Sequence, residues 1–152
     1  MNAVYASAMN TYARTEVETG VNDATPEKLI VMLYDGAIRA ISTAHLAMQR
    51  HDLTTKGIQI SKAIGIIEEG LNGSLDLKAG GEIARNLADL YDYMCNRLLT
   101  ASARNDLSAL EEVRRLLSEL RDAWNTLVTR QNAAANPDQP AQRADASSYG
   151  KA

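Results

Sequence analysis

The side chains that could do chemistry are few in this sequence, and their spacing does not assemble them into a site. His45 and His51 are six residues apart, so on one helix they point away from each other and cannot easily share a metal ion. Cys95 has no second cysteine and no nearby histidine, which makes a small packed residue its default role. Glu68-Glu69 and Glu111-Glu112 are adjacent pairs, and adjacent residues of a helix do not face each other. We therefore expect no catalytic residue, no metal site, no cofactor and no enzyme activity.

The composition excludes further classes of protein. The chain has 152 residues, of which 45% are hydrophobic and 23% charged, which suits one domain with a single core. The net charge is −3 without a basic block, so we expect no nucleic-acid partner. The single cysteine indicates a reducing compartment, and neither a signal peptide nor an apolar run of membrane-spanning length is recognisable. We expect a cytoplasmic protein without membrane insertion.

Helical patterns dominate, and no strand pattern competes with them. Thr25 and Pro26 open the first helix as a hydroxyl cap followed by a proline at the first helical position. The expected helices span about 26–50, 55–72, 82–104 and a last one that starts after Asn105 or Asp106. Because short loops join them, we predict an all-α, antiparallel up-down four-helix bundle over residues 24–131.

Each expected helix carries an apolar arc at helical spacing, which we predict to form the core. The members are Ile30, Leu33, Tyr34, Ala37, Ile41, Ala44 and Met48; Ile60, Ala63, Ile64, Ile67 and Leu71; Ile83, Leu87, Leu90, Tyr91, Met94, Leu98 and Ala101; and Leu110, Val113, Leu117, Leu120, Trp124 and Leu127.

Several apolar residues remain outside these arcs. Met32, Ile58, Ile66 and Leu99 are surplus to a core that needs one face of each helix, so we expect them to bind a partner. Ala84, Ala88 and Cys95 form a stripe with Leu99, which indicates either close packing of a neighbouring helix or a docking seam. Gly36 interrupts the first helix at a cost of ~1 kcal/mol, which indicates that another backbone packs closely there.

The two termini are patterned differently from the bundle. Residues 1–23 are weakly patterned, and Tyr5 and Tyr12 lie at approximate helical spacing with Met9. We interpret this stretch either as a frayed terminus or as a mobile lid whose tyrosines cover an apolar groove until a partner displaces them. Residues 132–152 are small and polar with Pro137 and Pro140, which predicts a disordered tail.

Two motifs carry a resemblance to a known family. Met32–Arg39 reads MLYDGAIR and Leu90–Met94 reads LYDYM, and Trp124 follows near the end of the last helix. In this order and spacing they resemble the flagellin export chaperones over about residues 1–130. The resemblance implies a cytosolic chaperone that binds the C-terminal, helix-forming segment of flagellin, prevents premature polymerisation and delivers its client to a component of the export gate. It also favours the lid interpretation of the N-terminal segment.

Two other interpretations remain open at this point. Histidine phosphotransfer modules are also four-helix bundles with one exposed histidine, and His45 lies at the edge of the first core arc. However, Leu46–Gln49 follows it in place of the lysine and glycine typical of that class. A generic dimerising bundle that binds another folded protein is the second alternative, and a homodimer is compatible with either chaperone or bundle.

Overall fold

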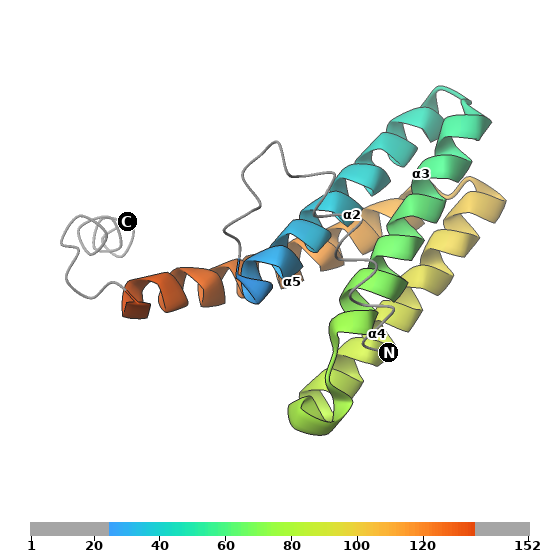
Figure 1. Cartoon of the computed structure of the whole chain (residues 1–152). Coiled ribbons are helices and arrows are strands. Elements are labelled where there is room, and N and C mark those ends of the chain that lie inside the picture. Colours follow the sequence, from blue (N-terminus) through green and yellow to red (C-terminus); the bar gives the residue numbers. More distant parts are fainter. Residues whose placement is uncertain (1–24, 136–152) are drawn as a thin grey trace.

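The computed structural model describes residues 25–135, which fold into a bundle of four helices without a strand in that range. Helix α2 (Pro26–Gln49) turns into α3 (Leu53–Gly65), which continues as a π-helical turn η3 (Ile66–Leu71) and a 3₁₀ turn η4 (Asn72–Ser74). Helices α4 (Leu77–Arg104) and α5 (Leu107–Ala135) complete the bundle. Successive helices run in opposite directions (Figure 1). The predicted all-α up-down bundle is therefore confirmed.

Helix starts are set by side chains that accept hydrogen bonds from free backbone N–H groups. The Thr25 hydroxyl accepts from the N–H of Lys28 at 3.2 Å, with Pro26 at the first helical position as predicted. Asp52 begins α3 by accepting from the N–H of Thr55 at 3.1 Å. Asp76 and Asp106 begin α4 and α5 in the same way.

Helix α2 is the central element, because it packs against α3 and η3 on one side and against α5 on the other. All seven residues of its predicted arc are buried, and so are Val31, Ala40 and Ala47. Every helix contributes to the core around it. The largest fully buried side chains are Tyr34, Tyr91, Ile41, Ile66, Ile67, Leu71, Met94, Leu98, Leu110, Leu117 and Val113.

The π-helical turn η3 brings more of the chain into the core than a regular α-helical arc would. Its i→i+5 hydrogen bonds place an extra residue in the turn, and Ile66, Ile67, Gly70 and Leu71 are all buried. A side chain at Gly70 would approach the methyl groups of Leu33 to 3.0 Å, so this glycine permits close packing on α2. Over Gly36 the structure places the Ile66 side chain. The expectation of a second backbone at Gly36 was therefore wrong.

Lys56 is the buried charged residue of the described core region, with 7% of its surface exposed. Its ammonium group donates to the Ser102 carbonyl oxygen at 3.0 Å and to Asn105 Oδ1 at 2.7 Å. Asn105 ends α4 in a left-handed conformation, with φ of 52°. A lysine of α3 thus satisfies a free carbonyl at the C-terminus of α4, where the helix dipole favours a cation.

Among the described helices, α2 alone is long and apolar enough to cross a bilayer by those two criteria. A central helix of a soluble bundle meets the same criteria, and the apolar residues of α2 are the ones that fill this core.

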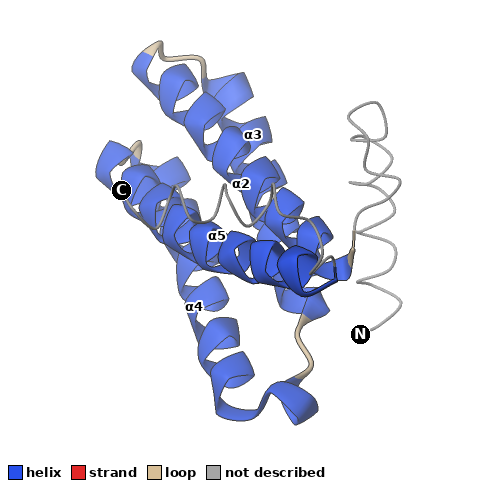
Figure 2. Cartoon of the chain, turned by 90° about the vertical axis from the view of Figure 1, so that its left-hand side faces the viewer, coloured by secondary structure: helices blue, strands red, loops and turns tan. Residues whose placement is uncertain are grey.

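Some boundaries and core positions differ from the sequence prediction. Helix α4 starts at Leu77 and is interrupted at Gly81, where φ is 57°, so its continuous part begins where predicted. The start of α4 extends past α5 (Figures 1 and 2), and Ile83 is 73% exposed. Leu127 is exposed on the last turns of α5. Both were wrongly predicted as core, because helical spacing gives a face but not whether a neighbour reaches it.

Helix α5 continues to Ala135, beyond residue 131 where we predicted the bundle to end. The expected N-terminal segment 1–23 lies outside the described residues, as does the tail from residue 136 onward.

Replacing Lys56 with methionine should destabilise the bundle by about 1–3 kcal/mol, because it removes two hydrogen bonds from a charged donor but keeps the apolar stem. The measurement is thermal unfolding followed by circular dichroism. The control is Lys62→Met, at an exposed lysine of the same helix, which should change stability by less than about 0.5 kcal/mol. Equal unfolding temperatures for the two variants would contradict this role of Lys56.

Candidate functional site

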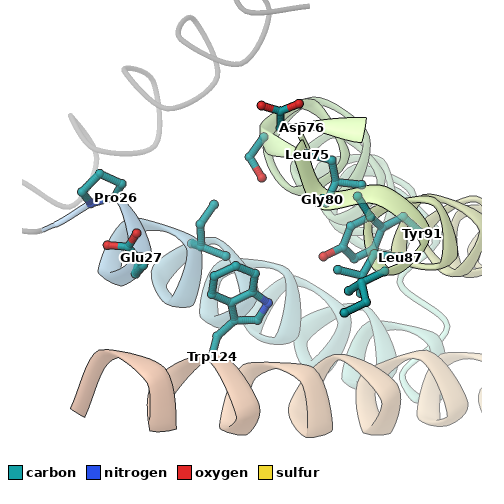
Figure 3. Close-up of a pocket in the computed structure, with 12 residues that line it drawn as sticks. Pro26, Glu27, Leu75, Asp76, Gly80, Leu87, Tyr91 and Trp124 are labelled. Carbon is teal, nitrogen blue, oxygen red and sulfur yellow. The ribbon is translucent and has the colours of Figure 1, made fainter. Parts of the chain in front are cut away.

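An open apolar pocket of about 330 Å³ lies at the end of the bundle where α2 and α4 begin (Figure 3). This volume falls at the lower end of the range of ligand pockets, ~300–1,000 Å³. Its walls come from α2, η4, the start of α4 and one residue of α5. The lining residues are Pro26, Glu27, Ile30, Ser74, Leu75, Asp76, Gly80, Ile83, Ala84, Leu87, Tyr91 and Trp124.

Two tyrosines and a tryptophan form a polar cluster beside this pocket. The hydroxyl groups of Tyr34 and Tyr91 are 2.5 Å apart, and the Trp124 indole N–H donates to the Tyr34 hydroxyl. Burial raises the pKa of both tyrosines, so both stay protonated. Figure 3 shows Tyr91 and Trp124 extending toward each other from α4 and α5. The cluster ties α2, α4 and α5 together at the wall of the pocket.

The pocket mouth carries negative charge. Glu27 lies in the first turn of α2, and Asp76 is the N-cap of α4. No lysine or arginine is among the twelve lining residues. The pocket is therefore apolar inside and acidic at its edge.

The structure does not bring the predicted partner-binding residues to this pocket. Ile58 and Leu99 are 61% and 57% exposed, on α3 and α4 respectively. Met32 is half-buried on α2. None of the three lines the pocket. Tyr5 and Tyr12 lie outside the described residues.

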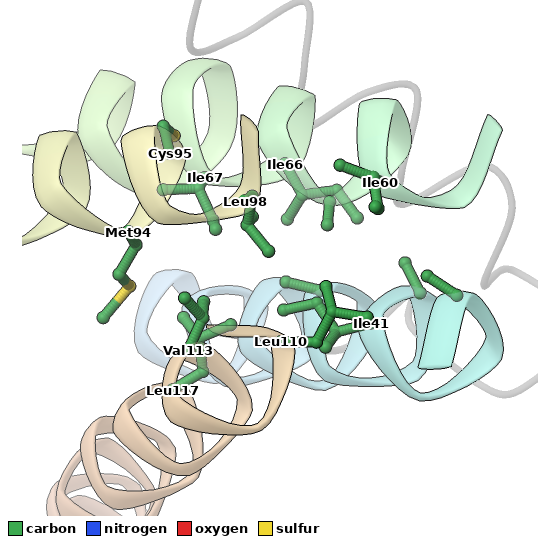
Figure 4. Close-up of a cluster of buried hydrophobic side chains, with 14 of the residues drawn as sticks. Ile41, Ile60, Ile66, Ile67, Met94, Cys95, Leu98, Leu110, Val113 and Leu117 are labelled. Carbon is green, nitrogen blue, oxygen red and sulfur yellow. The ribbon is translucent and has the colours of Figure 1, made fainter. Parts of the chain in front are cut away.

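Ile66 was placed outside the core arc by sequence, and this placement was wrong. Its exposed fraction is 1%, because α2 covers this side of the helix and Gly36, which has no side chain, leaves room for the Ile66 side chain. Figure 4 shows Ile66 extending from the η3 turn into the core, with Cys95 lying beside Ile67. Ile66 offers no surface to a partner in this structure.

The stripe of small residues on α4 is shared between packing and surface. Ala84 and Cys95 are buried, whereas Leu99 is exposed. Ala84 is also part of the pocket wall. Burial raises the pKa of the Cys95 thiol to about 12, which removes its thiolate as a nucleophile at neutral pH. Close packing explains most of the stripe.

The other titratable candidates are not assembled into a site. His45 is half-buried on α2, whereas His51 is exposed in the turn after it with φ of 59°. Within residues 25–135 no cluster of three histidine, cysteine or carboxylate side chains could hold a metal ion.

Five residues that line the pocket were predicted only as core: Ile30, Ile83, Leu87, Tyr91 and Trp124. Tyr91, Leu87 and Trp124 were predicted as core, and all three are buried or partly buried. What the arcs could not show is that Tyr91, Leu87 and Trp124 also border an opening. The two adjacent glycines Gly80 and Gly81 were the available signal, since they mark the break at the start of α4.

Comparison with known proteins shows the family to which this chain belongs. The family model described as Flagellar protein FliS matches residues 8–131. The chain belongs to the FliS family. The flagellar secretion chaperone FliS of Salmonella typhimurium strain LT2 is 49% identical over 122 residues, which cover 80% of this chain and 90% of that protein. The flagellar secretion chaperone FliS of Escherichia coli K12 is 45% identical over 119 residues, which cover 78% of this chain and 88% of that protein. The one of Bacillus subtilis 168 is 36% identical over 111 residues, which cover 73% of this chain and 81% of that protein.

The match to the FliS family includes the whole pocket, since its lining residues fall between 26 and 124. It confirms the resemblance drawn from the MLYDGAIR and LYDYM motifs. The chain therefore belongs to a family of flagellar secretion chaperones.

The hydrogen bond between Tyr34 and Tyr91 should couple the stabilities of the two residues. Tyr91→Phe should cost about 1–2 kcal/mol, because it leaves the Tyr34 hydroxyl without this partner in a buried site. The double variant with Tyr34→Phe should cost less than the sum of the single variants by about 0.5 kcal/mol or more. Urea unfolding measures all three.

The control for this cycle is Tyr93→Phe on the same helix. It removes a hydroxyl that donates to Glu112 of α5 in an exposed position, where a hydrogen bond to a carboxylate contributes little, so it should cost less than about 1 kcal/mol. Strict additivity of Tyr34→Phe and Tyr91→Phe would show that the two hydroxyl groups do not interact in solution.

Proposed function

We propose that this protein is a cytoplasmic chaperone that binds the C-terminal, helix-forming segment of flagellin, prevents its premature polymerisation and assists its delivery to the export apparatus. Membership of a family of flagellar secretion chaperones supports this proposal. The structural observation that carries it is apolar surface left over after the core is filled. Ile58 and Leu99 are exposed on two neighbouring helices, α3 and α4.

Binding a disordered client has an ordering cost in free energy, which burial of exposed apolar surface can offset. A disordered segment that folds on binding gives up roughly 2–5 kcal/mol or more in ordering. At ~25 cal/mol per Å² of apolar burial, offsetting that cost alone takes about 80–200 Å². Exposed aliphatic side chains on rigid helices can supply this area without unfolding the chaperone.

The residues proposed to bind the client are Ile58 and Leu99, on α3 and α4, and the half-buried Met32 on α2. Methionine suits an adaptable binding surface because its side chain is flexible and polarisable. Tyr5 and Tyr12, on the N-terminal segment, are proposed as a lid that covers apolar surface until the client displaces it. The lid rests on sequence pattern and family resemblance.

The remaining parts of the proposal concern other partners and chemistry. A component of the export gate receives the loaded complex, and a homodimer is compatible with the bundle. With a net charge of −3, the chain is proposed to bind no nucleic acid. It acts by binding alone, without catalysis or a cofactor.

Charge at the proposed surface should weaken flagellin binding without unfolding the bundle. Ile58→Asp and Leu99→Asp should each reduce affinity by roughly tenfold or more, since each loses the burial of an aliphatic side chain. The measurement is calorimetric titration with monomeric flagellin, and circular dichroism verifies the fold. Ile66→Asp should instead unfold the bundle, because it buries an unpaired charge.

Leu53→Asp is the matched control, since Leu53 is as exposed as Ile58 but is not part of the proposed surface. Flagellin without its C-terminal segment should not bind. If this truncated flagellin binds as tightly as the full chain, the client segment is misassigned. If no flagellin binds, the proposed function is wrong.

Deleting residues 1–15 should leave the bundle folded, because the first helix is capped by Thr25. The deletion should increase binding of an apolar fluorescent dye and tighten flagellin binding, since nothing competes for the surface. Unchanged dye binding and unchanged affinity would eliminate the lid, and loss of the helical signal would assign the segment to the core.

A further inference from the structure

Helix α4 begins with one turn that is set at an angle to the rest of the helix. Residues 77–80 form this turn, Gly81 has a φ of 57° and a ψ of −133°, and the remaining helix continues to Arg104. Figure 2 shows the turn at the lower end of the molecule. All four of its residues are exposed, so side-chain packing contributes little to holding the bend.

The bent form of α4 requires both of the glycines at the bend. The φ of Gly81 is one that residues with a side chain rarely adopt, whereas glycine adopts it readily. A Cβ atom at Gly80 would lie 2.6 Å from the Cβ atom of Ala84, which is too close for two carbon atoms that are not bonded. In a regular helix, Cβ atoms four residues apart are separated by about 5–6 Å. The close approach at Gly80 therefore exists only because α4 is bent.

A continuous α4 would require neither glycine, because alanine is the best helix former. A Cβ atom at Gly81 would meet no other atom within 4 Å in the bent form, so an alanine there acts through the backbone angle alone. The first turn already has helical geometry and a cap, since Asp76 accepts from the N–H groups of Lys78 and Ala79 at 3.1 and 3.0 Å. Rotation of the backbone at Gly81 therefore converts the bent helix into a straight one.

Straightening α4 is coupled to the packing of Leu75. Only Leu75 and Asp76 separate η4 from α4, and η4 directly follows Leu71, which is fully buried. At 1.5 Å per residue, a continuous helix would place Leu77 about 7.5 Å beyond Glu82 along the helix axis. Because η4 is fixed to the core, the two-residue link must then extend. Leu75, which packs against the core and lines the pocket, would be withdrawn.

We propose that Gly80 and Gly81 form a hinge that switches α4 between two states. In the bent state, which the structure shows, Leu75 closes one wall of the pocket at this end of the bundle. In the straight state, α4 is continuous from Leu77, Leu75 is withdrawn from the core, and the pocket is wider. The hinge is a property of the fold and does not depend on the proposed client.

The accessibility of position 75 reports the state of the hinge. A Leu75→Cys variant of the full-length chain is alkylated under native conditions, with the buried Cys95 as the slow internal reference. Adding Gly80→Ala or Gly81→Ala should raise the alkylation rate at position 75 by about tenfold, as expected when a state populated to ~10% or less becomes the major one. Gly57→Ala is the matched control, because a Cβ atom at this glycine of α3 meets nothing within 4 Å. It should leave the rate unchanged.

Hydrogen exchange distinguishes straightening of α4 from local unfolding. In Gly81→Ala the amide groups of residues 82–85 should exchange more slowly than in the unaltered chain, because a continuous helix gives each of them a carbonyl partner four residues earlier. Local unfolding would instead raise both the exchange rate and the alkylation rate. A rescue variant restores the bend, since Ala84→Gly removes the Cβ atom that an alanine at Gly80 would meet. Gly80→Ala with Ala84→Gly should therefore return to the alkylation rate of the Leu75→Cys chain.

Three results would overturn the hinge. Equal alkylation rates in the Gly80→Ala, Gly81→Ala and Gly57→Ala chains would show that no straight state forms. Faster hydrogen exchange at residues 82–85 in Gly81→Ala would show local unfolding in its place. Loss of the helical circular dichroism signal in both hinge variants would show that folding requires the bend. None of these measurements uses flagellin, so each outcome leaves the proposed function untouched.

Discussion

The burial of α2 from two sides is the constraint on which the rest of this structure depends. Ten of its residues are buried, and α3 with η3 covers one side while α5 covers the other. An apolar helix that is covered in this way needs antiparallel neighbours joined by short turns. Polar contacts at the edge have less weight, since the ion pair between Arg121 and Asp35, at 2.9 Å, is partly exposed and such pairs contribute little.

The same arrangement determines where the bundle is left open. Helices α2 and α4 both begin at one end, and the break at Gly81 directs the first turn of α4 away from its continuous part. The hydrogen bond between Tyr34 and Tyr91 holds α2 and α4 together just inside this end. Beyond it no side chain of residues 25–135 fills the space between the helices, and the pocket bordered by Trp124 results.

A chaperone of this kind must keep apolar surface accessible while its own fold stays stable. The structure separates the two needs by helix face. Tyr91, Met94 and Leu98 fill the core from one face of α4, and Leu99 is exposed on another. Binding at this outer face, as proposed, would leave undisturbed the packing on which stability depends. Because exposed residues such as Leu99 are not part of the core, substituting them should not weaken core packing.

Sequence by itself determined the all-α class, the starts of α2 and α5, and the complete core arc of α2, because helical caps and periodicity are local properties. It also determined the family, through the MLYDGAIR and LYDYM motifs. Tertiary structure decided the burial of Ile66, the exposure of Ile83, and the existence of the pocket. Ile66 is buried because it packs over Gly36 of α2. Ile83 is exposed because no helix within residues 25–135 covers it. The pocket is a space between helices that are distant in sequence, and periodicity, which gives the apolar face of each helix, does not specify how far that face is covered.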